Sequence, residues 1–108
     1  MLKFGPDGLI PAIVHDAKTG EVLMVAYMNA EAVRRTLASG QAWFYSRSRQ
    51  ELWHKGATSG SFLNLRSIDK DCDEDALLLH VEPQGPVCHT GERTCFFRPL
   101  SPEDVPAE

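Results

Sequence analysis

The chain has 108 residues, of which 43% are hydrophobic and 24% charged, as in one globular domain over residues 1–108. A net charge of −4 argues against a nucleic-acid partner held through its phosphates. No apolar run approaches the roughly 20 residues that span a membrane, and the N-terminus lacks a signal-peptide pattern, so we expect a protein of the cytoplasm with no membrane partner. Three cysteines, an odd number, favour metal ligation or catalysis over a closed disulfide framework.

The first elements predicted are two strands joined as a hairpin. Two apolar runs, residues 9–14 and 21–28, flank the turn-forming residues 16–20. Pro11 has no amide hydrogen to donate to a neighbouring strand. We therefore expect it at the edge of a sheet or at the start of its strand.

A helix is predicted over residues 30–39. Asn29 suits its N-cap, and Gly40 suits the position just past its end. Ala30, Val33 and Leu37 fall at helical spacing, and we expect this stripe to face the core.

The second half of the chain predicts mostly strands. Residues 41–46, 62–68 and 76–81 have β character, and residues 99–108, rich in proline and acidic residues, read as a loosely ordered tail. The fold class predicted is therefore α+β: a mostly antiparallel, strongly curved, barrel-like sheet with one main helix.

The acidic segment DCDED combines hard and soft metal ligands. If a strand begins at or before Asp71, side-chain alternation places Asp71, Asp73 and Asp75 on one face and Cys72 on the other. Carboxylates suit Mg²⁺ or Ca²⁺, and a thiolate suits zinc. The alternative is a solvated acidic turn. A calcium-binding EF-hand is excluded because Ala76 occupies the position that needs glycine.

Three cysteines, Cys72, Cys88 and Cys95, are candidates to bind one zinc ion. Three protein ligands leave a position open for water, which is typical of catalytic zinc. Their spacing matches no standard zinc finger, and buried free thiols are the alternative. His89 is a possible fourth ligand, but beside Cys88 in an extended chain it would point away. We therefore prefer it as a general acid or base.

A local basic segment within this acidic protein suits phosphate. Arginine gives charge-assisted hydrogen bonds, and glycine lets backbone amides approach an anion closely. Trp53 and Tyr45 could stack on a base, although core packing is the ordinary role of such residues. The alternative for the whole segment is a solvent-facing hairpin. The candidate phosphate-binding residues are Ser46, Arg47, Ser48, Arg49, Lys55, Thr58 and Ser59.

Taken together, these motifs resemble one family, phosphoribosyl-AMP cyclohydrolase of histidine biosynthesis. The matching segments run from Gly8 to Phe97, which is nearly the whole chain. They are GLIPAIV, GEVLMVAYMN, YSRSR, LWHKGATSG, DCDEDALLL and CHTGERTCF.

The resemblance implies a zinc-dependent hydrolase that opens the adenine ring of phosphoribosyl-AMP. It implies an obligate, intertwined homodimer in which Cys72 of one subunit joins Cys88 and Cys95 of the other at zinc. It also implies that Asp71, Asp73 and Asp75 bind magnesium. We expect the monofunctional form, without the pyrophosphate removal from phosphoribosyl-ATP that fused versions carry on a C-terminal domain.

One residue departs from the family pattern: Ala57 stands where KGETSG has glutamate. In the expected mechanism His89 or His54 moves protons, and Arg47, Arg49 and Lys55 hold the substrate's phosphates. Thr58, Ser59 and Trp53 complete the predicted substrate site. Two other functions are alternatives, a non-enzymatic zinc module and a deaminase of a different nucleotide. The second lacks the expected H-x-E and P-C-x-x-C motifs.

Overall fold

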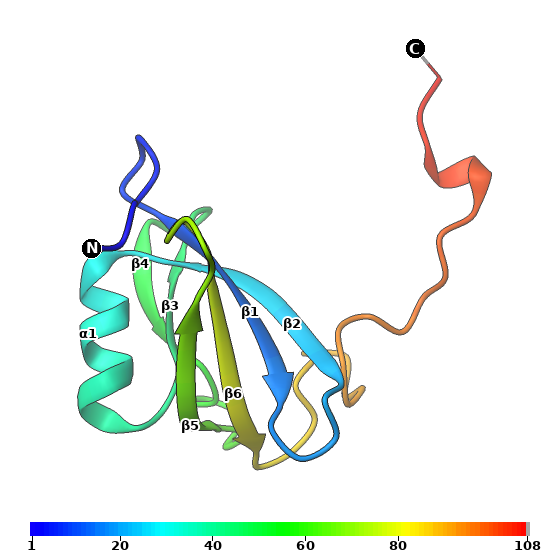
Figure 1. Ribbon diagram of the computed structural model, residues 1–108. Helices are drawn as coiled ribbons and strands as arrows, with labels where there is room; N and C mark the ends of the chain where they lie inside the picture. Colours follow the sequence, from blue (N-terminus) through cyan, green and yellow to red (C-terminus); the bar gives the residue numbers. More distant parts are fainter. Residues whose placement is uncertain (108) are drawn as a thin grey trace.

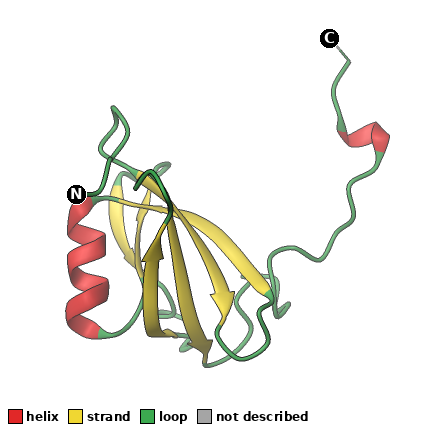
Figure 2. Ribbon diagram, in the orientation of Figure 1, coloured by secondary structure: helices red, strands yellow, loops and turns green. Residues whose placement is uncertain are grey.

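Two β-sheets and one α-helix form the body of residues 1–107, the part of the chain that this computed structural model describes (Figures 1 and 2). This agrees with the predicted α+β class. In chain order the elements are β1 (Ile10–Asp16), β2 (Val22–Met28), α1 (Ala30–Ser39), β3 (Trp43–Ser46), β4 (Glu51–His54), β5 (Leu63–Lys70), β6 (Leu77–Pro83) and a short 3₁₀ turn (Pro102–Asp104).

The larger sheet has the strand order β2-β1-β6-β5, and β3 pairs with β4 in a separate two-stranded sheet. All pairs are antiparallel except β1 with β6, which run parallel. The mostly antiparallel arrangement is therefore confirmed. Within residues 1–107 the strands form two separate sheets and do not close into a barrel. The strand β4 was not predicted.

The first hairpin follows the prediction closely. Pro11 is the second residue of β1, and the pairing of β1 with β6 begins only at Ala12. The missing amide hydrogen of Pro11 therefore falls before that ladder starts, as expected for a proline near the start of a strand.

Alternation along β1 and β6 builds the core. Ile10, Ala12 and Val14 of β1 are fully buried, as are Leu79 and Val81 of β6. The opposite face of the same sheet keeps apolar side chains at its surface: Ile13, Val22 and Val25. The larger sheet therefore buries one face and leaves an apolar outer face.

Helix α1 begins and ends as predicted, but its buried face matches the predicted stripe only in part: Val33 packs against the core. The Asn29 side chain accepts a hydrogen bond from the Ala32 amide (2.8 Å), and Gly40 adopts the left-handed conformation with φ 74°. The predicted stripe is wrong at Leu37, which is 63% exposed, whereas Ala32 and Thr36 are buried.

Thr36 can point inward because its hydroxyl is fully used. It donates to the carbonyl of Ala32 (2.8 Å) and accepts from the amide of Trp43 (2.9 Å). Such a bond satisfies the polar group locally and ties α1 to β3.

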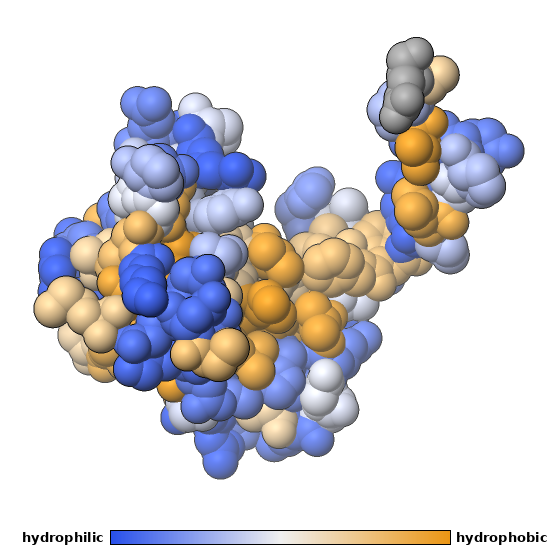
Figure 3. Space-filling model, turned by 45° about the horizontal axis from the view of Figure 1, so that its top comes forward, coloured by the Kyte–Doolittle hydropathy of each residue, from blue (hydrophilic) through white to orange (hydrophobic). Residues whose placement is uncertain are grey.

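The C-terminal residues extend away from the sheets (Figure 1). Apolar surface runs along this segment (Figure 3), where Phe96 is 60% and Leu100 is 79% exposed. The segment predicted as a tail, 99–108, is described up to residue 107, and position 108 lies outside the described residues. No helix in residues 1–107 is long and apolar enough to cross a membrane.

Candidate active site

Strand β6 separates the two groups of predicted metal ligands. The acidic segment immediately precedes this strand, and the segment with Cys88 and Cys95 follows it, so the two groups lie toward opposite ends of the sheet (Figure 1). Seven strand residues span about 20 Å. One copy of the chain therefore holds two separate candidate metal sites.

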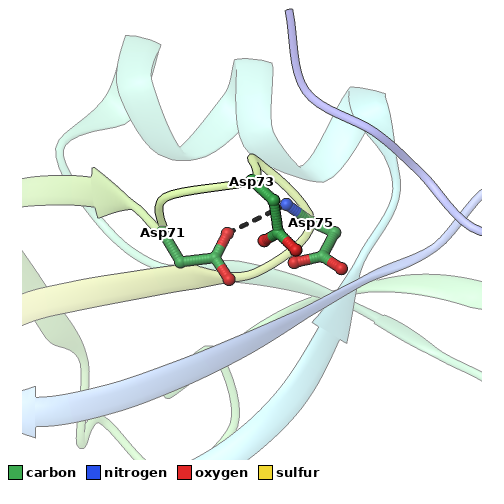
Figure 4. A group of neighbouring side chains, drawn as sticks. All are labelled: Asp71, Asp73 and Asp75. Carbon is green, nitrogen blue, oxygen red and sulfur yellow. Dashed lines mark hydrogen bonds between the residues drawn. The ribbon is translucent and has the colours of Figure 1, made fainter.

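The acidic segment is a turn between β5 and β6, so the predicted strand alternation within it is wrong. The Asp71 amide donates to the carbonyl of Ala76 (3.0 Å), and Glu74 has a positive φ of 66°. The Asp71 carboxylate accepts a hydrogen bond from the amide of Asp75 (2.9 Å; Figure 4) and another from the amide of Ala76 (3.1 Å). A hairpin turn, and not one strand face, gathers these residues.

The three aspartates nevertheless come together as predicted. Possible ligand oxygens of Asp71, Asp73 and Asp75 all lie within 4.8 Å of one another, and all three residues are exposed. Hydrogen bonding to Asp73 and Asp71, together with their negative charge, raises the pKa of Asp75 to about 6. Three converging carboxylates have the chemistry that Mg²⁺ or Ca²⁺ requires.

The second site is a pair of thiols after β6. Cys88 is buried, and the hydroxyl of Thr90 donates to its sulfur (3.1 Å), which lowers the pKa of Cys88. Cys95 neighbours Cys88, and partial burial of its thiol, together with the Cys88 thiol, raises its pKa. The Cys95 amide donates to the carbonyl of Leu23 in β2 (2.8 Å), which fixes the second thiol against the sheet.

Lys55 lies beside this thiol pair. Its ammonium donates to the carbonyl of Val87 (2.6 Å). Partial burial lowers the pKa of Lys55, while the neighbouring Cys95 and Cys88 act in the opposite direction. A cation there favours the thiolate forms that bind zinc.

The turn after Lys55 requires glycine. Gly56 has φ 92°, and a Cβ atom there would lie 2.5 Å from the amide nitrogen of Phe62. This close approach of two backbone segments places Lys55 at the site.

The third cysteine does not join the pair within one chain. Cys72 is exposed in the β5–β6 turn. Among residues 1–107 only the three aspartates form a group of three potential metal ligands. The zinc site predicted from three cysteines is therefore not assembled by a single copy.

A cleft beside Cys88 collects most of the predicted substrate and catalytic residues. Its volume of ≈ 470 Å³ is in the range of small-molecule sites. Ala57 also lines it, so a glutamate at that position would belong to the cleft, where Glu51 is the one lining carboxylate. The predicted residues that line it are Arg49, Trp53, His54, Lys55, Thr58, Ser59, Cys88 and His89.

The two candidate histidines differ in their surroundings. His89 is exposed and lines the cleft beside the thiols. His54 is half-buried, and its Nε2 atom hydrogen-bonds with the side-chain oxygen of Gln41 (2.9 Å). Its ring also stacks on Trp43 and contacts Phe62. His89 is the freer of the two to meet a substrate.

Arg47 lies in a different, neighbouring cleft. Its guanidinium carbon is 3.9 Å from the ring centroid of Tyr27. Arg49 and Trp53 line both clefts. The predicted basic segment is thus divided, with Lys55 at the thiols and Arg47 apart from them.

Sequence reasoning missed three residues that support these sites: Tyr27 under Arg47, Thr90 at Cys88, and Arg93. The guanidinium of Arg93 donates to Asp16 and Glu21 and thereby ties the cysteine segment to the β1–β2 turn. All three lie in the motif segments GEVLMVAYMN and CHTGERTCF. Their presence in these motifs was the available signal. The contacts of Tyr27 and Arg93 join residues far apart in the chain, whereas Thr90 contacts a cysteine only two residues away.

Comparison with known proteins agrees with the resemblance found in the sequence motifs. The family model for phosphoribosyl-AMP cyclohydrolase matches residues 24–97. A protein of that name from Lactiplantibacillus plantarum is 62% identical over 97 residues, which cover 90% of each chain. One from Clostridium botulinum is 57% identical over 98 residues, 91% of this chain and 88% of the other. A histidine biosynthesis bifunctional protein from Bacillus subtilis is 57% identical over 104 residues, 96% of this chain but 50% of its own length.

Proposed function

The chain belongs to the phosphoribosyl-AMP cyclohydrolase family of histidine biosynthesis, and from this premise we propose how it opens the adenine ring of phosphoribosyl-AMP. The reaction is hydrolysis of the bond between nitrogen 1 and carbon 6, with zinc as cofactor. The observation that carries this proposal is the thiol pair, Cys88 and Cys95, beside Lys55. Cys88 lines the cleft described above and Cys95 a neighbouring one, and His89 lines both. The product is the ring-opened phosphoribosylformimino intermediate.

The thiol pair suits zinc by its chemistry. Two neighbouring sulfur atoms, one with a lowered pKa, are good ligands for a borderline-soft ion. Zinc supplies Lewis acidity that activates water at neutral pH. Cys88 and Cys95 would hold it, and Lys55 would stabilise their thiolate forms.

The third ligand is proposed to be Cys72 from a second copy of the chain. Cys72 and the thiol pair lie toward opposite ends of β6, so one chain does not bring them together. In a homodimer the exposed Cys72 of one copy would complete the site of the other. The apolar outer face with Ile13, Val22 and Val25 offers surface that such pairing would bury.

The residues of the cleft have separate roles in the proposed mechanism. Trp53 provides an aromatic wall for the purine, and Arg49, Thr58 and Ser59 provide donors for phosphate and ribose oxygens. His89 accepts a proton from the water that adds to carbon 6. It returns a proton to nitrogen 1 as the bond between nitrogen 1 and carbon 6 breaks.

The three aspartates are proposed as the magnesium site. Converging carboxylates are the ligands that this hard cation prefers. Cys72 belongs to the same turn as the three aspartates. A cation bound there would therefore also order the segment that presents this thiol to the second copy. We also propose that the enzyme acts in the cytoplasm, as expected from the sequence.

The test is a continuous absorbance assay of ring opening with phosphoribosyl-AMP. Wild-type protein should turn over, and a zinc chelator or Cys88→Ser should remove activity while Arg98→Ala, an exposed control, keeps it. Full activity in a zinc-free preparation would contradict the proposal. Global unfolding on zinc removal, without turnover before it, would instead assign the metal a purely structural role.

A further inference from the structure

Arg47 differs from the other arginines of the body in its charge partners. Arg34, Arg35, Arg49, Arg66 and Arg93 all form salt bridges with carboxylates. Arg98, which forms no such bridge within residues 1–107, belongs to the C-terminal segment that extends away from the sheets. Within residues 1–107 no carboxylate pairs with Arg47. In a chain of net charge −4, this guanidinium is available to an anion.

The guanidinium is held over an aromatic ring. It lies 3.9 Å from the ring centroid of Tyr27, within the range of a cation–π contact. Tyr27 is half-buried in β2, where it pairs with Pro11 of β1, so its ring sits on a fixed strand. The exposed arginine belongs to the β3–β4 turn. The strand residue therefore orients the turn residue.

The same turn gathers further donors for an anion. The Arg49 amide donates to the hydroxyl of Ser46 (3.3 Å), and the hydroxyls of Ser46 and Ser48 are 3.4 Å apart. These residues line one cleft together with Arg47 and Tyr27. Arginine and hydroxyl donors converging in a cleft are suited to a phosphate group.

This cleft adjoins the cleft that Cys88 lines, but neither Cys88 nor Cys95 lines it. Trp53 and Arg49 line both. If the purine packs against Trp53, its reacting edge would face the thiols. One of the two phosphorylated riboses attached to the purine would then extend into the cleft that contains Arg47. Phosphoribosyl-AMP carries two such arms, one phosphomonoester on each ribose.

We propose that the cleft between Tyr27 and Arg47 binds one phosphomonoester of the substrate, and that Tyr27 is a positioning residue that acts through Arg47. This inference rests on the proposed function. It assigns a role to Tyr27 and places one phosphate away from Lys55 and the thiols.

The test is a double-mutant cycle on the kinetics of the full-length enzyme. Arg47→Ala should raise KM about tenfold or more because a charge-assisted bond is lost. Tyr27→Leu should raise KM about two- to fivefold with kcat little changed, the size of an exposed cation–π contact. Tyr27→Phe keeps the ring and should leave KM unchanged.

The cycle also separates positioning from direct binding. In the Arg47→Ala background, Tyr27→Leu should have no further effect on KM, because its partner is already gone. Additive effects would overturn the positioning role, and an unchanged KM in Arg47→Ala would overturn the phosphate assignment. Both outcomes require that the wild-type enzyme opens the ring of phosphoribosyl-AMP. An inactive wild type would instead contradict the proposed function itself.

Competitive inhibition identifies which of the two phosphorylated riboses of the substrate binds at Arg47. AMP and ribose 5-phosphate each carry one phosphomonoester, and each is tested as an inhibitor of wild type and Arg47→Ala. Weaker inhibition of Arg47→Ala by AMP alone assigns the nucleotide arm, and weaker inhibition by ribose 5-phosphate alone assigns the arm on nitrogen 1. Unchanged inhibition by both compounds would contradict a phosphate site at Arg47.

Discussion

The imidazole of His54 stacks in parallel on the indole of Trp43, with ring centroids 4.4 Å apart and an angle of 5° between the planes. Its Nε2 atom is engaged by Gln41. We therefore predict that His54→Ala lowers the free energy of unfolding by about 1–2 kcal/mol through loss of stacking and a hydrogen bond. Urea denaturation measures this. If the free energy of unfolding is unchanged and kcat falls strongly, His54 acts in proton transfer and not in stability.

His89 should show the opposite behaviour. It is exposed in the cleft beside the thiols, so removing its imidazole should cost little stability. We predict that His89→Ala lowers kcat by about 100-fold or more, the usual contribution of a general acid–base group. Steady-state kinetics and the pH profile of kcat measure this. A kcat within twofold of wild type would exclude His89 as the proton carrier.

Arg93 should support the thiol segment from a distance. Its guanidinium bridges Asp16, which is buried, and Glu21. We predict that Arg93→Ala lowers the free energy of unfolding because the buried carboxylate of Asp16 loses a charged donor. Arg98→Ala, which removes an exposed arginine outside these bridges, is the matched control. Equal midpoints of urea unfolding for the two variants would show that the bridges contribute no stability.

Thr90 should tune the reactivity of Cys88. The hydroxyl of Thr90 donates to the Cys88 sulfur and is the main cause of its lowered pKa. In metal-free protein, Thr90→Val should raise that pKa and slow alkylation of Cys88 at neutral pH, because only the thiolate reacts. Mass spectrometry of iodoacetamide labelling against pH measures this, with Thr58→Val as control. Identical labelling profiles would contradict the role of Thr90.

Asp75 should titrate with a pKa of about 6 in the metal-free protein. Its pKa is raised to about 6, chiefly by Asp73 and then Asp71, from an ordinary value of 3.8. Since the folded-state pKa is the higher one, the stability that its proton contributes is present at low pH and is lost as pH rises through about 6. Carbon-13 NMR titration should show Asp73→Asn shifting the Asp75 pKa downward. No shift would contradict this coupling.

The same carboxylates should make magnesium binding pH-dependent. Because a proton on Asp75 competes with the cation, affinity for Mg²⁺ should fall as pH drops below about 6. Isothermal titration calorimetry at several pH values measures this, with Asp69→Asn, outside the turn, as control. Equal affinity across this range would show that Asp75 is not a ligand.

Local chemistry made several elements of the fold predictable. Asn29 and Gly40 define helix α1 through their own caps, and the turn residues 16–20 join two apolar runs. The strand β4 was missed because Glu51–His54 is four residues long and mixes charged, aliphatic and aromatic side chains. The buried face of α1 depends on Thr36, whose hydroxyl bonds to Ala32 within the helix and also accepts from the amide of Trp43, a tertiary contact that the helical pattern does not show.

The candidate site was predictable in its residues more than in its arrangement. The clustering of Asp71, Asp73 and Asp75 was expected from a strand, yet a hairpin turn produces it. Lys55 was grouped with Arg47 because they are near in sequence. The fold instead brings Lys55 to Val87, 32 residues away, and such a long-range contact leaves no periodic signal in the chain.

Sharing of the zinc site between two copies is the central claim, and subunit complementation tests it most directly. Cys72→Ser and Cys88→Ser should each be inactive alone. Co-expressed in equal amounts, half of the dimers are mixed and each mixed dimer keeps one intact site, so activity should return to about a quarter of wild type. No recovery in the co-expressed pair, or full activity of Cys72→Ser alone, would contradict the account.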